Sequence, residues 1–152
     1  MEFRLFLPHK YKLIGWIILI PSFIMGALLM AGIKFEINAP VFSIWGMKNE
    51  NFTIIYEDIY NEIIGIPLLI SLMMVAFSRE KIEDEYIMKI RLESLLWAIF
   101  LNFIIIFFTI LFVYNDAFYD IMTYNLFTVL IFFIVRFNFV LFIINKQLDN
   151  EK

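Results

Sequence analysis

The chain has 152 residues, of which 62% are hydrophobic and 19% aromatic, and its mean hydropathy is +0.84. A soluble domain averages roughly 45–50% apolar residues, and one of this size keeps much of its surface wet, so it could not bury the excess. The formal net charge of −3 offers no basic patch for nucleic acid. The lack of cysteine excludes disulfides and Cys-ligated metals. We therefore expect one all-α membrane domain.

Four apolar runs are expected to cross the bilayer as transmembrane helices. The hydrocarbon core requires about 20 apolar residues per helix, and the first, third and fourth runs reach that length. The second run is shorter, and extending it takes in Glu62, which we place at the headgroup level. The predicted spans are 13–33, 59–77, 95–114 and 124–144.

The fourth run contains a single charge, Arg136. An arginine at a helix centre costs about 2.5–3.5 kcal/mol on insertion, whereas each Leu, Ile, Phe or Val returns about 0.3–0.6 kcal/mol. The 16 such residues between Tyr124 and Ile144 return roughly 5–10 kcal/mol on the same scale. We therefore expect this run to insert, with Arg136 close to the midplane.

Lysine and arginine are concentrated in three segments: the N-terminus, the 78–94 segment and the C-terminal tail. Together these carry nine basic residues, whereas the 34–62 loop carries two and the 115–123 loop none. Because cytoplasmic segments hold the excess of positive charge, both termini are predicted to lie in the cytoplasm, below a bacterial inner membrane. An alternative makes 1–31 a cleaved signal peptide, but its apolar run exceeds the usual 7–15 residues.

The outer loop, 34–58, is the largest segment that we place outside the membrane. Two short alternating stretches, 34–37 and 41–45, flank Asn38-Ala39-Pro40 and would allow a small hairpin. An isolated hairpin is only marginally stable in water. We therefore expect a solvated loop that rests on the bilayer surface.

The inner segment, 79–94, is predicted to be a helix. Ser78 is a suitable N-cap, acidic residues follow it, and apolar residues recur at helical spacing. No Gly or Pro separates this segment from the third span, so we expect one helix over 81–114 that projects into the cytoplasm. It is either a charged linker on the headgroups or a face that docks a protein partner or a second copy of the chain. The residues assigned to that face are Glu83, Asp84, Glu85, Tyr86 and Arg91.

Ionisable residues within a membrane are candidates for function. If the last two spans form an antiparallel hairpin around a 115–123 loop, Arg136 lies at the depth of Asn102, with Asn138 nearby. These three residues form a candidate buried polar cluster. Its functional interpretation is a site in which Arg136 contacts an anion, a lipid headgroup or the carboxylate of Glu62. Its structural interpretation, which we favour, is that Asn102 and backbone carbonyls hydrogen-bond Arg136 and fix the helix packing.

Several membrane activities lack their required residues. A four-helix cytochrome commonly uses paired histidines, but His9 is the sole histidine, and the His-Glu-x-x-His helix of zinc proteases is absent. Small multidrug transporters place a carboxylate deep in the first span, and 13–33 has none. We expect no cofactor, no metal and no enzymatic activity.

Two stretches carry a resemblance to a known group of proteins. They are Phe77-Ser-Arg-Glu-Lys-Ile-Glu-Asp-Glu-Tyr-Ile, continuing through Leu92-Glu-Ser-Leu-Leu-Trp97 to Asn102, and the later 136–140 segment. They resemble small four-span membrane proteins of Bacteroidetes over roughly the second half of the chain. The resemblance implies the architecture, and it implies no activity.

The leading functional expectation is therefore a non-enzymatic accessory, sensor or scaffold subunit of a membrane complex. One alternative is an oligomeric pore or a holin-like effector, with Asn102, Arg136 and Asn138 along the path. Another is a small-molecule transporter that depends on Arg136. These classes differ in whether the chain binds a partner, leaks solutes or moves one substrate.

Overall fold

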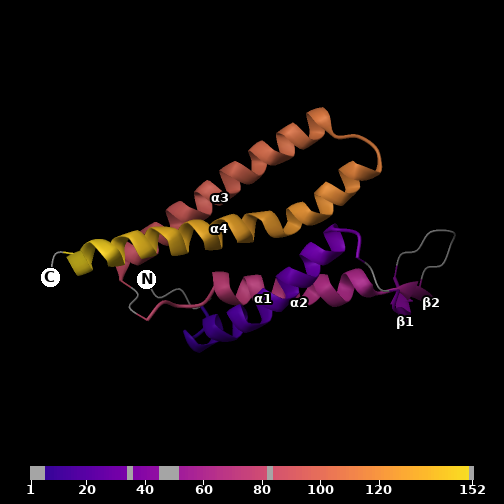
Figure 1. The fold of residues 1–152 in the computed structure, drawn as a ribbon, viewed down its shortest axis with the longest axis horizontal. Helices are drawn as coiled ribbons and strands as arrows, with labels where there is room; N and C mark the ends of the chain where they lie inside the picture. Colours follow the sequence, from indigo (N-terminus) through magenta and orange to yellow (C-terminus); the bar gives the residue numbers. More distant parts are fainter. Residues whose placement is uncertain (1–5, 34–35, 45–51, 82–83, 151–152) are drawn as a thin grey trace. The chain divides into compact units, whose positions relative to one another are not determined.

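The computed structural model describes residues 6–33, 36–44, 52–81 and 84–150. Three of the helices in this part of the chain, α1, α3 and α4, are long and apolar enough to cross a membrane, and α2 is a shorter apolar helix. The expectation of an all-α fold needs one correction, because two strands precede α2 (Figure 1). In chain order the elements are α1 (Lys10–Met30), β1 (Asn38–Ser43), β2 (Thr53–Asp58), α2 (Tyr60–Ala76), α3 (Glu85–Phe112) and α4 (Asp116–Asn150).

The chain divides into two compact units, and their boundaries fall inside α1 and α2. Trp16–Ser71 form the first, which we call the hairpin unit because it contains both strands. Met1–Gly15 and Leu72–Lys152 form the second, which we call the α3–α4 unit. The contacts described below lie within one unit or the other.

In the hairpin unit, β1 and β2 pair antiparallel, with Asn38 opposite Asp58 and Ser43 opposite Thr53. The strands therefore differ from the two stretches predicted in the sequence, because Pro40 lies inside β1. Pro40 faces Tyr56. The Ile59 N–H donates to the Ile37 carbonyl, and because hydrogen-bonded and non-hydrogen-bonded pairs alternate along an antiparallel ladder, Pro40 and Tyr56 form a non-hydrogen-bonded pair. That alternation leaves Pro40 where a backbone N–H would point away from the partner, so the strand tolerates it.

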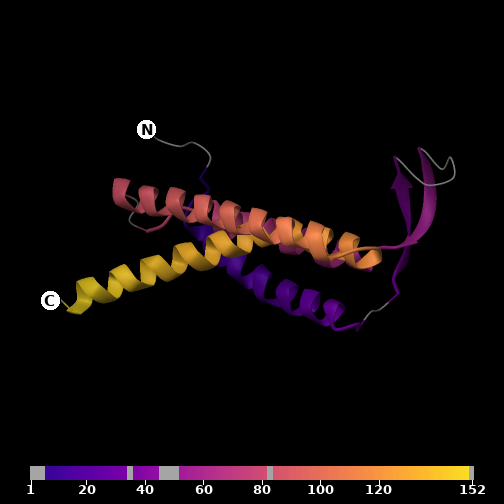
Figure 2. The ribbon, with the colours of Figure 1, turned by 90° about the horizontal axis from the view of Figure 1, so that it is seen from above.

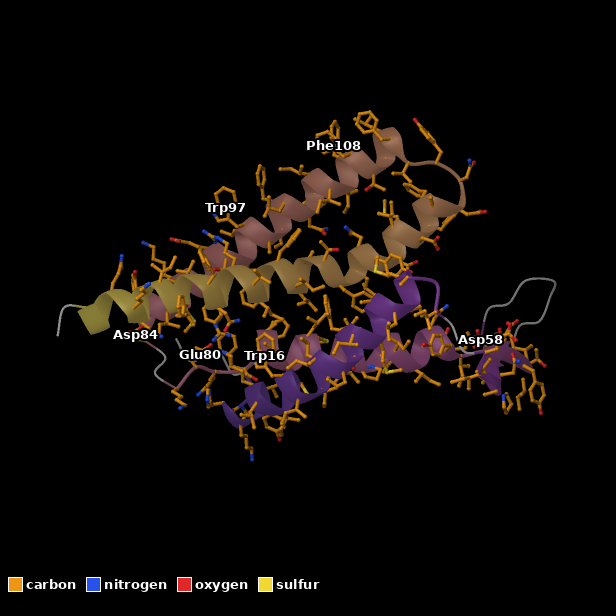
Figure 3. All side chains as sticks on the ribbon, viewed as in Figure 1. Trp16, Asp58, Glu80, Asp84, Trp97 and Phe108 are labelled. Carbon is orange, nitrogen blue, oxygen red and sulfur yellow. The ribbon has the colours of Figure 1, made fainter. Side chains whose placement is uncertain are left out.

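Asp58 joins the sheet to the helix that follows. Its carboxylate accepts hydrogen bonds from the backbone N–H of Ile37 at 3.0 Å and of Tyr60 at 3.1 Å. The first bond closes the end of the ladder and the second satisfies an N–H of the first turn of α2, which otherwise has no partner within the helix. Figure 3 shows Asp58 where the sheet meets α2.

In the α3–α4 unit, α3 and α4 pack against each other as an antiparallel pair, and Figure 2 shows the same pair from above. Their connection is short, Val113–Asn115, and Asn115 adopts a left-handed conformation with φ of 60°. Asn tolerates this conformation because its short side chain hydrogen-bonds locally. The predicted 115–123 loop is therefore wrong, since most of it forms the first turns of α4.

α3 begins later than the sequence suggested. Its N-cap is Asp84, whose carboxylate accepts from the backbone N–H of Ile87 at 2.8 Å. The predicted cap, Ser78, instead donates its hydroxyl to the Met74 carbonyl, one turn back along the chain. The expected long helix is present, but it starts at Glu85 rather than at residue 81.

The exposed face of α3 is apolar, whereas its buried face, which packs against the rest of the unit, carries small and polar residues. Its outward face is a column of large apolar side chains that are all more than half exposed: Leu92, Leu96, Phe100, Phe103 and Phe107. In Figure 3, Phe108 points away from α4. The buried stripe instead contains small and polar residues, namely Arg91, Ser94, Ala98, Asn102 and Thr109. Small and polar residues at helix contacts, with apolar ones outside, are the pattern of helices solvated by lipid.

Gly15 marks a close approach between α1 and α2. A Cβ atom there would lie 2.8 Å from Cγ2 of Val75 and 3.1 Å from its backbone nitrogen. Gly26, three turns further along α1, has nothing nearer than 3.9 Å. Gly15 rather than Gly26 is therefore the position where a side chain would force the helices apart.

Candidate functional site

Arg91 links the start of α3 to the end of α2. It is 6% exposed, and its Nη1 donates to the carbonyls of Ala76 at 3.1 Å and Ser78 at 3.2 Å, while Nη2 also donates to Ser78. The last carbonyls of a helix have no intrahelical partner, and the C-terminal end of a helix carries partial negative charge. Arg91 therefore acts as a C-terminal cap for α2 that is supplied by another helix.

Two aromatic rings enclose the same guanidinium. Its Cζ lies 4.6 Å from the ring centroid of Phe6, which precedes α1, and 4.8 Å from that of Phe137, on α4. Rings at this distance attract a cation through their negative faces. Arg91 thus joins the N-terminal segment, α2, α3 and α4 at one point, which we call the Arg91 junction.

The N-terminal segment is held at the junction by its backbone. Leu7 forms an isolated parallel bridge with Ser78, in which its N–H donates to Phe77 and its carbonyl accepts from Arg79, both at 2.9 Å. His9 Nδ1 lies 2.9 Å from the Arg79 carbonyl. The start of the chain and the α2–α3 connection are therefore in direct contact.

Lys12 adds an ionic link. Its Nζ lies 2.5 Å from a carboxylate oxygen of Glu80 and 3.3 Å from Oδ1 of Asn138. Asn138 in turn donates its amide to the Ile134 carbonyl at 2.7 Å, so its orientation is fixed by its own helix. The Lys12 and Glu80 side chains are 15% and 14% exposed, so water screens their attraction less than on an open surface.

Further along the pair, Asn102 and Asn125 form a reciprocal amide contact. Asn125 donates to Asn102 at 2.9 Å, and Asn102 returns a longer contact of 3.4 Å. Each carboxamide offers both a donor and an acceptor, so two asparagines can satisfy one another without a third group. This contact fixes the register of α3 against α4.

Arg136 reaches across from α4 to α3. Its Cζ lies 5.3 Å from the ring centroid of Trp97, which is half exposed. Its Nη1 atom is buried, and within the described part of the chain no atom accepts a hydrogen bond from it. A guanidinium carries five N–H donors, so this one retains capacity for an acceptor.

The predicted polar cluster is dispersed among three different partners. Asn102 pairs with Asn125, Asn138 contacts Lys12, and Arg136 lies over Trp97. The reason is the position of the α3–α4 connection. When the centre of a helical hairpin loop moves by one residue along the chain, the residue that faces a given position on the other helix moves by two. The structure therefore does not bring Arg136 to Asn102.

The predicted docking face is divided in a similar way. Glu85 and Tyr86 are exposed, and Asp84 is exposed while it caps the helix. Arg91 needs a correction, because it is buried at the junction and not available to a partner. Glu83 lies outside the described residues.

Sequence reasoning missed Asn125, and it assigned Ser78 to a helix cap rather than to the contact with Arg91. A signal for the buried stripe was present, since Arg91, Ser94 and Asn102 follow helical spacing within an apolar helix. Nothing in the sequence indicated that the segment before α1 pairs with the segment after α2.

The chemistry of the described residues is that of contacts and charge. No group of three or more His, Asp or Glu that could hold a metal occurs among them. A scan against protein-family models matched none, and searches of curated proteins and of solved structures found no similar protein. The fold thus defines a helical protein with three candidate membrane spans, and its distinctive features are the Arg91 junction and Arg136.

Proposed function

We propose that the chain is an integral protein of a bacterial inner membrane, with four spans and with both termini and the α2–α3 connection in the cytoplasm. The contact between Leu7 and Ser78 carries this proposal. Two segments in direct contact lie on the same side of a bilayer, so the chain between them crosses an even number of times. If α1 crosses once, α2 must cross back.

The length of α2 is compatible with a crossing. Its 17 residues rise about 26 Å, somewhat less than the roughly 30 Å hydrocarbon core. A short hydrophobic stretch is accommodated by local thinning of the bilayer at a cost of fractions of a kcal/mol per Å. Lys12, near the N-terminus, contacts Asn138 in the C-terminal half of α4. This contact supports a C-terminal tail on the same side of the membrane as the N-terminus.

Cysteine accessibility tests this topology cleanly, because the chain has no cysteine of its own. We would place single cysteines at the exposed positions Glu57, Lys89, Asp120 and Lys146 and label intact cells with an impermeant maleimide. Four spans predict labelling at residues 57 and 120 and protection at 89 and 146. Labelling of 57 and 89 alike, or protection of both, would exclude a crossing by α2.

The function that we propose is that of a non-enzymatic accessory or scaffold subunit that binds a protein partner through the exposed side of α3 near its start. Glu85, Tyr86, Lys89 and Glu93 are exposed there, while Ile90, Arg91 and Ser94 are buried on the opposite side. A rigid helix anchored by Arg91 presents these side chains in fixed positions. The aromatic side chain of Tyr86 is 58% exposed, and aromatic residues are enriched at protein interfaces.

A photo-crosslinking residue at Tyr86 tests this proposal in intact membranes. We expect one discrete adduct, either with another protein or with a second copy of the chain, and its loss when Glu85→Lys and Lys89→Glu are added. The matched control is the same crosslinker at Tyr119, which is 71% exposed near the start of α4. No adduct at position 86, or the same adduct at position 119, would count against docking at α3.

A further inference from the structure

Among the described residues, Arg136 has an aromatic ring beside it and no carboxylate at ion-pair distance. Its guanidinium lies 5.3 Å from the Trp97 ring centroid, and its buried Nη1 has no acceptor within the described part of the chain. No carboxylate of that part makes an ion pair with it; the Glu80 carboxylate is engaged by Lys12. A charged donor in this state requires an acceptor that the described protein does not supply.

The ring of Trp97, which the guanidinium contacts, also lines an apolar hollow. Leu96, Trp97 and Phe100 line an open depression of about 320 Å³ on the outer side of α3. These three side chains are 58%, 50% and 57% exposed, so the depression faces the surroundings of the protein. A ligand that fits here has a negative group for Arg136 and an apolar chain for Leu96 and Phe100.

The depth of Arg136 favours a headgroup phosphate. Trp97 comes one turn after Glu93, the last charged residue at that end of α3, which is a rise of about 6 Å. Tryptophan is enriched at the boundary between headgroups and hydrocarbon. The guanidinium over its ring therefore lies at the level where phosphates meet acyl chains.

From this arrangement we propose that Arg136 and Trp97 form a binding site for an anionic phospholipid. Arg136 donates hydrogen bonds to the lipid phosphate, and an acyl chain lies along Leu96 and Phe100. Guanidinium groups bind phosphate through two parallel hydrogen bonds. Arg136 is only partly buried, and the nitrogens of its guanidinium other than Nη1 are the donors that a phosphate can reach. An anionic lipid is preferred to a zwitterionic one because the latter carries its own cation near the phosphate.

This inference rests on the proposed membrane location, and the two can fail separately. Cysteine labelling reports the topology alone, whereas the lipid site is read from the fluorescence of Trp97. The other two tryptophans are removed with Trp16→Phe and Trp45→Phe, so that Trp97 is the remaining fluorophore. The full chain is reconstituted in phosphatidylcholine vesicles with a small, equal fraction of brominated phosphatidylglycerol or brominated phosphatidylcholine.

We expect brominated phosphatidylglycerol to occupy the site about fivefold more than brominated phosphatidylcholine, which is the preference that about 1 kcal/mol per basic residue corresponds to. Arg136→Gln should abolish the difference, and Arg136→Lys should retain part of it. Lys146→Gln removes one exposed charge from the same helix and should leave the preference intact. Equal quenching by the two lipids, or a preference that survives Arg136→Gln, would overturn the proposal.

Discussion

Arg91→Met removes the guanidinium at the junction while keeping an apolar side chain of similar length. In the native chain, this guanidinium donates to the carbonyls of Ala76 and Ser78 and lies between the rings of Phe6 and Phe137. Methionine fills the space between the rings but donates nothing, so both carbonyls lose this donor. The substitution therefore tests whether the charge holds the end of α2 in place.

The magnitude follows from the two carbonyls and from the buried charge. A buried acceptor left without a donor costs about 1–3 kcal/mol, which gives about 2–6 kcal/mol for two. Removing a buried cation also removes its desolvation cost, which offsets part of that loss. We therefore expect Arg91→Met to lower the free energy of unfolding by about 2–4 kcal/mol.

Unfolding by SDS in mixed micelles, followed by far-ultraviolet circular dichroism, measures this change. Lys89→Met is the matched control, because Lys89 is an exposed cation two residues away on the same helix and surface changes usually stay within about 0.5 kcal/mol. Arg91→Lys keeps the charge but not the branched guanidinium, so its loss of unfolding free energy should lie between those of Lys89→Met and Arg91→Met. A loss below about 1 kcal/mol for Arg91→Met would refute the capping role.

Three further predictions use the same unfolding assay. Gly15→Ala should destabilise by about 1–3 kcal/mol because its methyl group would meet α2 at 2.8 Å, whereas Gly26→Ala, with nothing nearer than 3.9 Å, should be neutral or slightly stabilising. Leucine substitutions at Asn102 and Asn125 should show a coupling energy of about 1 kcal/mol in a double-mutant cycle, and a pair of cysteines at these positions should cross-link on mild oxidation. Asp58→Ala should cost about 1–2 kcal/mol and speed backbone hydrogen exchange in the hairpin, because one carboxylate bonds both the strand end and α2.

Each of these has a clear contradicting result. Equal stability of the two glycine variants would mean that α1 and α2 do not approach at Gly15. Additive leucine effects, or cross-linking of Asn102 to Arg136 rather than to Asn125, would reject the observed register. Unchanged exchange after Asp58→Ala would show that the ladder alone holds the hairpin.

The apolar helices were predictable because their signal is local and strong. Hydropathy located α1, α3 and α4, since long uncharged runs have few other interpretations. The hairpin was harder, because β2 has no strict alternation and Pro40 suggested a turn rather than a strand. Its stabilising bond, from the Ile37 N–H to the Asp58 carboxylate, joins residues 21 positions apart and leaves no pattern in either segment.

The start of α3 shows how a nonlocal contact overrides a local signal. Ser78 has the side chain of an N-cap, but the backbone around it pairs with Leu7, which lies far earlier in the chain. That pairing places Ser78 in a strand-like bridge, and α3 begins only at Glu85, after its N-cap Asp84. Beside that pairing, the carbonyls of Ala76 and Ser78 accept from Arg91, which the sequence assigned to the docking face and which is buried there. Both differences therefore arise at the segment after α2, where Ser78 contacts residues far away in the sequence.

The position of the α3–α4 connection decides what Arg136 does. With a 115–123 loop, the arginine would lie near the midplane and would need a buried partner to offset its insertion cost of about 2.5–3.5 kcal/mol. In the structure α4 begins at Asp116, so Arg136 follows 20 residues later, a rise of about 30 Å. The short connection thus sets which residue faces Arg136: its guanidinium lies 5.3 Å from the ring centroid of Trp97 on α3, and Asn102 instead meets Asn125. If Trp97 marks the headgroup boundary, as we propose, the guanidinium beside it meets lipid phosphates there and has no need of a buried carboxylate on another helix.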